Sequence, residues 1–295
     1  MDQDDKEPEG NASTAPVAGG IYWSAASDDD MFAQGDIVRR IGVQGQPGEY
    51  GLVLTADCDF AQRKNSNRIS YIEIVSIERY LDDYWAPDQL AKHLLKQVSP
   101  AVQQIAGLMR RSGSDLALND TRLLDWLRRR TVEEVEAAMG IAFDAKLKRT
   151  LAGIRCAADD AAEPVPLRRW MRLRQLMGDS TQQVRSAAAA AFAGTGFPDY
   201  FVLPELPGSD EYGHVAVLRS MRTVPASEVY VSEIEARISD RPNDLHRAGR
   251  LPDGIRFAFA QKIAFLFSRI GLPEHYEAAC SSAAALAAES IINEN

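Results

Sequence analysis

Two β-rich stretches, separated by a long segment with helical periodicity, constrain the fold of this chain more than any other feature. The first, residues 35–77, holds three short runs of β-branched and aromatic residues with turn residues between them. The second, residues 200–231, holds three more, whereas residues 85–193 repeat apolar side chains every three or four positions. We therefore expect an α+β protein in which two distant segments form one β domain around an inserted helical block.

The same pattern sets the expected domain boundaries. Residues 1–30 contain eight acids, one Lys and little to bury, so we expect a disordered acidic arm. This arm either only keeps the chain in solution or competes with nucleic acid for basic residues. Residues 31–84 and 197–295 are expected to form the β domain and its C-terminal helices, and residues 85–196 the helical insertion. Within the insertion, Pro100 is expected to separate two helices.

Charge is distributed unevenly along the 295 residues. The formal net charge of the chain is −9, but residues 100–185 hold fifteen bases and only eleven acids. Trp126 and Trp170 lie among these bases, and basic side chains next to aromatic rings can bind a nucleic-acid backbone and stack on bases. The alternative is a solvated helix face, because acids lie between the basic clusters. The residues expected to bind nucleic acid in this section are Arg168, Arg169 and Arg172.

The first β-rich stretch contains an unusual cluster, Asp57-Cys58-Asp59, directly after an apolar run. If the strand continues through it, Asp57 and Asp59 point to one face of the sheet and Cys58 to the other. Two carboxylates on one face can hold a divalent metal ion or act as an acid–base pair. Alternatively, they accept backbone N–H groups in a turn, and Cys58 is a small core residue.

Arginines on or beside the expected strands extend this candidate site. Such side chains either bind phosphate groups or form ion pairs with Asp57 and Asp59. If they bind phosphate, Arg39 or Arg222 stabilises the phosphate charge beside the two aspartates, and Arg222 is expected to be catalytic. The residues of the β domain expected to contact nucleic acid are Arg39, Arg40 and Arg219.

The sequence lacks the motifs that are typical of several other classes of protein. The four histidines are scattered, and no Walker loop, dinucleotide fingerprint or zinc-protease motif is present, so no cofactor is expected. The three cysteines form neither a disulfide framework nor a zinc site, and the N-terminus lacks the basic and apolar parts of a secretory signal. We therefore expect a cytoplasmic protein. No apolar run is long enough to cross a membrane.

The β-rich stretches resemble the PemK/MazF-type toxin family. The residues that carry the resemblance are Gly35-Asp36-Ile37-Val38, Leu52-Val53-Leu54, the turn from Asn65 to Asn67, the run from Ile69 to Val75, and the run from His214 to Val224. The resemblance implies a small SH3-like antiparallel barrel, interrupted here by the helical insertion, and a toxin–antitoxin or phage-defence setting. Glu49-Tyr50-Gly51 stands where ribonuclease members of the family place an Arg, which favours binding over cleavage by the family mechanism.

These observations lead to three functional hypotheses. The first is a binding or regulatory protein that contacts nucleic acid or a protein partner. The second is an enzyme, either an endoribonuclease or a metal-dependent phosphodiester hydrolase, that uses Asp57 and Asp59. The third is a scaffold in which the helical block mediates assembly, for example of a homo-oligomer.

Overall fold

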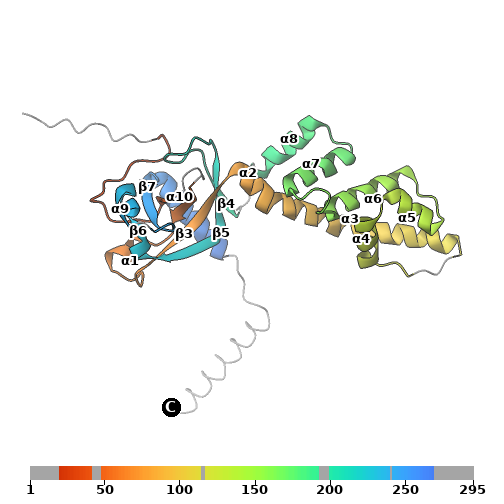
Figure 1. The fold of residues 1–295 in the computed structure, drawn as a ribbon, viewed down its shortest axis with the longest axis horizontal. Coiled ribbons are helices and arrows are strands. Elements are labelled where there is room, and N and C mark those ends of the chain that lie inside the picture. The colour runs from red at the N-terminus through yellow and green to blue at the C-terminus, as the bar shows by residue number, and fades with distance from the viewer. Residues whose placement is uncertain (1–19, 42–47, 114–116, 193–198, 240, 269–295) are drawn as a thin grey trace, which may run out of the picture. The chain divides into compact units, whose positions relative to one another are not determined.

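The computed structural model describes residues 20–41, 48–113, 117–192, 199–239 and 241–268. The chain forms two compact units (Figure 1): a β unit, made of residues 1–74 and 197–295, and a helical unit, made of residues 75–196. The β unit is therefore discontinuous in sequence. Residues 1–19 of the expected acidic arm, and the final helix expected over residues 274–292, lie outside the described residues.

The β unit is built around one mixed sheet. Its seven strands, in the order in which they lie side by side, are β4 (Tyr200–Leu203), β5 (His214–Pro225), β3 (Arg68–Ser76), β2 (Tyr50–Val53), β1 (Asp36–Arg40), β7 (Leu245–Arg250) and β6 (Val229–Tyr230). β1 pairs antiparallel with both β2 and β7, whereas β6 and β7 are parallel. The sheet unites both β-rich stretches of the sequence, because β5 lies next to β3.

The α+β class agrees with the sequence, but the expected SH3-like barrel is wrong. A barrel requires its first and last strands to pair with each other. Here β4 and β6 stand at opposite ends of an open sheet within the described part of the chain. Two features oppose closure: β6 has only two residues, and β7, which no apolar pattern predicted, extends the sheet beyond β1.

Apolar side chains on one face of this sheet form the main core. The register places Ile37, Leu52 and Ile72 opposite one another, and all three are completely buried. Each such side chain contributes roughly 1.5–3 kcal/mol by leaving water. The helix α10 (Asp253–Ser268) covers this core with side chains at helical spacing: Phe259, Ile263 and Leu266. A second core cluster of the β unit contains Val38, Val53, Ile69, Tyr71, Val229 and Leu245.

Short helical elements complete the β unit: α1 (Asp57–Ala61), the 3-10 turn η3 (Ala226–Glu228) and α9 (Glu233–Ile238). The helical unit consists of α2 (Ile77–Tyr80), the π-helical turn η1 (Leu81–Trp85), α3 (Ala86–Arg111), α4 (Asp120–Arg129), α5 (Val132–Met139), α6 (Ala145–Ala158), α7 (Pro166–Leu176), α8 (Thr181–Ala189) and the 3-10 turn η2 (Ala190–Phe192). The long helix α3 packs against both α6 and α7 (Figure 1). None of the described helices is long and apolar enough to cross a membrane.

The expectation that Pro100 separates two helices is wrong, because α3 continues through it. Proline has no N–H to donate to the carbonyl of residue 96, so the helix lacks one hydrogen bond at this turn. Val98, Ala101 and Val102 lie on both sides of the interruption and are buried in the core with α4, α5 and α6. Tertiary packing of this kind supplies most of a helix's stability and outweighs the local loss.

A buried ion cluster joins β1 and β7. The Asp36 carboxylate is completely buried and lies 2.5 Å from Arg250 and 3.7 Å from Arg247. The Arg247 guanidinium also donates hydrogen bonds to three backbone carbonyls near the N-terminus, those of Ser27, Asp30 and Met31. Because each of these charges has partners inside the protein, the cluster fixes residues 27–31 against the sheet.

We expect the substitution Asp36→Asn to lower the free energy of unfolding of the β unit by about 3–5 kcal/mol, because it leaves the buried Arg247 charge without its carboxylate. Native-state hydrogen exchange of the β1 and β7 amides measures this stability separately from that of the helical unit. The control is Asp59→Asn, since Asp59 contacts only the Cys58 thiol through its side chain among the described residues. Equal losses in both variants would contradict the role of the cluster.

Candidate functional site

The Asp57-Cys58-Asp59 cluster lies in a short helix and not at the end of a strand. β2 ends at Val53, and α1 begins at Asp57. The strand alternation expected for this cluster is therefore wrong. Both aspartates occupy the first turn of α1, where negative charge interacts favourably with the free backbone N–H groups of the helix.

Asp57 connects three segments of the β unit. Its carboxylate accepts the backbone N–H of Gln34 at 2.7 Å and pairs with Arg256 of α10 at 2.7 Å. Asp59 contacts the thiol of Cys58 at 3.8 Å, and Cys58 is exposed. Among the residues that the structure describes, no group of three or more His, Cys, Asp or Glu side chains could hold a metal ion. The structure therefore adds no third ligand to the two aspartates.

Three of the four arginines predicted near these aspartates pair with other carboxylates. The pairs are Arg222–Glu73 at 3.1 Å, Arg219–Asp199 at 2.6 Å and Arg40–Glu49 at 3.1 Å. The predicted catalytic residues Asp57 and Arg222 are thus each tied to a different partner. The fourth arginine, Arg39, forms no ion pair with any described residue and lies over the ring of Tyr50.

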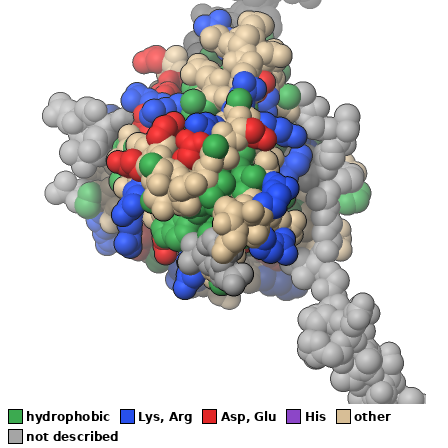
Figure 2. All heavy atoms as spheres, turned by 90° about the vertical axis from the view of Figure 1, so that its right-hand side faces the viewer, with side chains coloured by type: hydrophobic (Ala, Val, Ile, Leu, Met, Phe, Trp, Pro, Cys, Tyr) green, Lys and Arg blue, Asp and Glu red, His purple; other side chains and the backbone are tan. Residues whose placement is uncertain are grey.

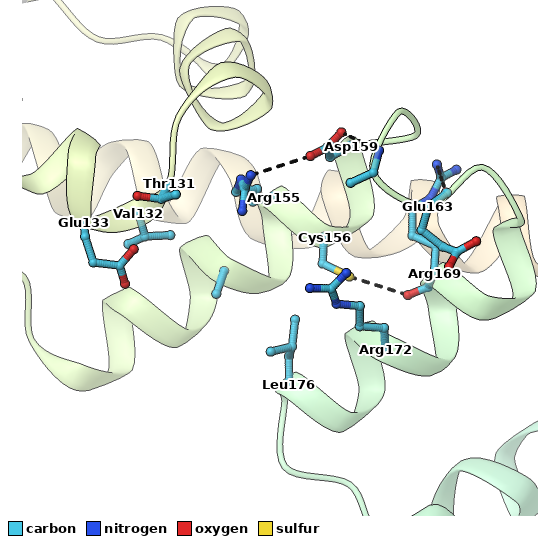
Figure 3. A pocket seen from close by; sticks show the side chains of 12 residues that line it. Thr131, Val132, Glu133, Arg155, Cys156, Asp159, Glu163, Arg169, Arg172 and Leu176 are labelled. Carbon is cyan, nitrogen blue, oxygen red and sulfur yellow. Dashed lines mark hydrogen bonds and ion pairs between the residues drawn. The ribbon is translucent and has the colours of Figure 1, made fainter.

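The three arginines predicted in the basic section all lie on α7. Trp170 and Leu173 form the buried face of this helix, and Arg168 and Arg172, four residues apart, are exposed on another face. Arg169 and Arg172 line a pocket of about 210 Å³ in the helical unit (Figure 3). The other polar residues of its wall come from α5, α6 and the loop after α6: Thr131, Glu133, Arg155, Cys156, Asp159 and Glu163.

Two carboxylates of this pocket are engaged within the protein. Asp159 accepts the backbone N–H of Ala162 at 3.1 Å and lies 3.8 Å from Arg155 (Figure 3). Glu163 accepts the backbone N–H of Val165 at 3.2 Å. Arg172, in contrast, has neither an ion pair nor a hydrogen bond to another described residue. Its charge is therefore available to a ligand.

Only some of the hydrogen-bond donors of the Arg169 guanidinium have partners. It donates to the carbonyl of Glu163 at 3.2 Å, but its Nε is buried and has no hydrogen-bond partner among the described residues. Burial raises the pKa of the Cys156 thiol, and the nearby Arg172 and Arg169 only partly oppose this shift. Cys156 therefore adds no negative charge beside Arg169 and Arg172, although Glu133 also lines the pocket.

Arg155 and Cys156 were not predicted as site residues. They belong to α6, whose apolar stripe indicated a helix and nothing more. The spacing of Arg155 and Asp159, four residues apart, is a sequence signal for a charged helix face, but it does not say what packs beside that face.

No family model, curated protein or solved structure matches this chain. The resemblance to the PemK/MazF-type toxins therefore stays a prediction from the sequence. The function must be argued from the sites themselves.

Two buried histidines of the β unit were not predicted as site residues: His214 on β5 and His246 on β7. Burial lowers the pKa of both side chains, and the nearby Glu211 and Glu233 only partly oppose the shift. The Nδ1 atom of each ring is buried without a hydrogen-bond partner among the described residues. Both rings are therefore neutral at pH 7.

We expect the β unit to lose stability as the pH falls below about 6.5, the ordinary pKa of histidine in an unfolded chain. In that range the unfolded chain binds protons at His214 and His246, whereas the folded protein binds them only at lower pH, so protons favour unfolding. Hydrogen exchange of the β7 amides, corrected for the intrinsic rate, measures this loss. The double variant H214Q/H246Q should show a weaker pH dependence, and an unchanged one would contradict the burial of two neutral rings.

Proposed function

We propose that this protein binds nucleic acid through its helical unit, with α7 as the contact element, and acts as a binding or regulatory protein. The observation that carries the proposal is the pocket of Figure 3. There Arg169 and Arg172 present guanidinium groups that no carboxylate of the described residues pairs with. Guanidinium groups bind phosphate oxygens through charge-assisted, often bidentate hydrogen bonds.

The charge of the helical unit supports this proposal. Residues 100–185 hold fifteen bases against eleven acids in a chain whose net charge is −9. Figure 2 shows Lys and Arg side chains around the periphery of the face turned to the viewer, with acidic and hydrophobic side chains between them. Three exposed arginines of the helical unit likewise have no ion-pair partner within the described ranges: Arg110, Arg129 and Arg130. Positive surface of this kind attracts the phosphate backbone.

The proposed contacts are to phosphates and not to bases. Trp170 is only 4% exposed and packs edge to face on Trp85, with 4.5 Å between the ring centroids. Trp126 packs against the core of the helical unit. The two aromatic rings that suggested base stacking are thus engaged inside the protein, so binding should depend little on sequence. A toxin–antitoxin or phage-defence setting remains part of the proposal, supported by the resemblance of the β-rich stretches.

We expect the double substitution R168A/R172A to weaken binding of a short labelled RNA by about tenfold or more at about 0.1 M salt, because two phosphate contacts are lost. The slope of log affinity against log salt concentration should decrease in magnitude by about 2, one for each lost contact. Fluorescence anisotropy of the full chain at several salt concentrations measures both quantities.

Lys92→Gln is the matched control, because Lys92 lies in the same unit and already pairs with Asp88 at 2.6 Å. This variant should keep the native affinity within about twofold, since exposed paired charges contribute little. The proposal is wrong if the double variant binds as the native chain does, or if Lys92→Gln loses as much affinity.

A further inference from the structure

A second polar site lies in the β unit, where three side chains of neighbouring strands form a row. The register pairs Arg39 of β1 with Tyr50 of β2 on one side and with His246 of β7 on the other. Cross-strand partners point to the same face of a sheet, so these three side chains are neighbours. The Arg39 guanidinium lies 5.3 Å from the centroid of the Tyr50 ring, whose hydroxyl donates to the carbonyl of Pro207 at 2.8 Å.

The Arg39 guanidinium is closely surrounded and interacts electrostatically with Glu233, but no described carboxylate forms an ion pair with it. A Cβ atom added to Gly48 would lie 2.7 Å from Arg39 Nε, and one added to Gly208, where φ is +67°, would lie 3.0 Å from its Nη1. Glycine at both positions therefore lets the backbone approach the guanidinium. Arg39 forms no ion pair or hydrogen bond with any described residue, whereas the adjacent Arg40 pairs with Glu49.

His246 lies beside this arginine and is only 5% exposed. Its Nδ1 is buried and has no hydrogen-bond partner within the described residues. Burial lowers the pKa of the ring; Glu233 opposes the shift, and Arg39 and Arg237 add to it. A neutral imidazole offers one N–H donor and one acceptor nitrogen, so His246 can donate to an anion without carrying charge.

Arg39 and His246 line a pocket of about 270 Å³ in the β unit. Ser232, at the N-cap of α9, accepts the N–H of Glu235 and keeps its hydroxyl proton for donation to a ligand. Two carboxylates, those of Asp28 and Glu233, also line the pocket, and Glu233 pairs with Arg237 at 2.6 Å. The pocket thus combines three donors with two acceptors.

We propose that this pocket binds the phosphate monoester of a small polyol, such as a sugar phosphate. The planar fork of Arg39 and the donors of His246 and Ser232 match the terminal oxygens of a phosphate group. The carboxylates of Asp28 and Glu233 accept the hydroxyl groups of the polyol. The volume, just below the range of drug-sized ligand pockets, suits a ligand of this size. This site shares no residue with the pocket on α7, so the inference does not rest on the proposed nucleic-acid binding.

Isothermal titration of the full chain with ribose 5-phosphate tests the proposal, with ribose and glutamate as ligands that lack the phosphate. Ribose 5-phosphate should bind and the other two should not. Arg39→Gln should weaken binding at least tenfold, and Arg39→Lys should weaken it less, because the charge remains but the fork is lost. Arg40→Gln is the matched control and should bind as the native chain does, since Arg40 does not line the pocket.

A second measurement does not depend on how well the Arg39 variants fold. The imidazole NMR signals of His246, assigned with His246→Gln, should shift when ribose 5-phosphate is added to the native chain. Because a 5′-phosphorylated RNA end carries the same group, a short RNA with and without a 5′-phosphate is titrated in parallel. Tighter binding of the 5′-phosphorylated RNA than of the same RNA without the phosphate, with the difference lost in Arg39→Gln, would assign the site to RNA ends. Ribose or glutamate binding as tightly as ribose 5-phosphate, unshifted His246 signals, or native affinity in Arg39→Gln would overturn the proposal.

Discussion

The buried pairing of Asp36 with Arg250 and Arg247 is the interaction on which the β unit depends. It joins the first strand to a strand more than two hundred positions later, and Arg247 extends it to the backbone of residues 27–31. Charges removed from water in this way are tolerated only when each has partners, so the cluster permits few alternative arrangements of β1 and β7.

Ion pairs with carboxylates also distinguish the arginines that stabilise the fold from those whose charge can bind a ligand. Arg222 and Arg256 are tied to Glu73 and Asp57, so their charges are already neutralised. Arg172 in the helical unit and Arg39 in the β unit have no such carboxylate among the described residues. Both line pockets together with neighbouring polar groups, which is why the two proposals place an anion there.

The two proposed sites differ in the way that each unit arranges its basic side chains. In the helical unit, basic side chains at helical spacing spread charge along a surface, which suits a polymer of phosphates. In the β unit, cross-strand neighbours such as Arg39 and His246 are held at fixed positions around a small pocket, which suits one phosphate and the group attached to it. The Asp57-Cys58-Asp59 cluster, the most conspicuous feature of the sequence, instead connects α1 to α10 through Asp57.

The sequence by itself determined the elements whose signals are local. Apolar spacing predicted helices over residues 85–193, and β-branched runs with turn residues between them predicted strands on both sides of this block. Only the tertiary structure decided how the sheet ends and which charges pair. β7 carries buried His246 and Arg247 where a strand pattern requires apolar residues, so no periodicity revealed it. Its polar side chains are stabilised by partners far away in sequence. Such contacts cannot be recognised from the local spacing of apolar residues.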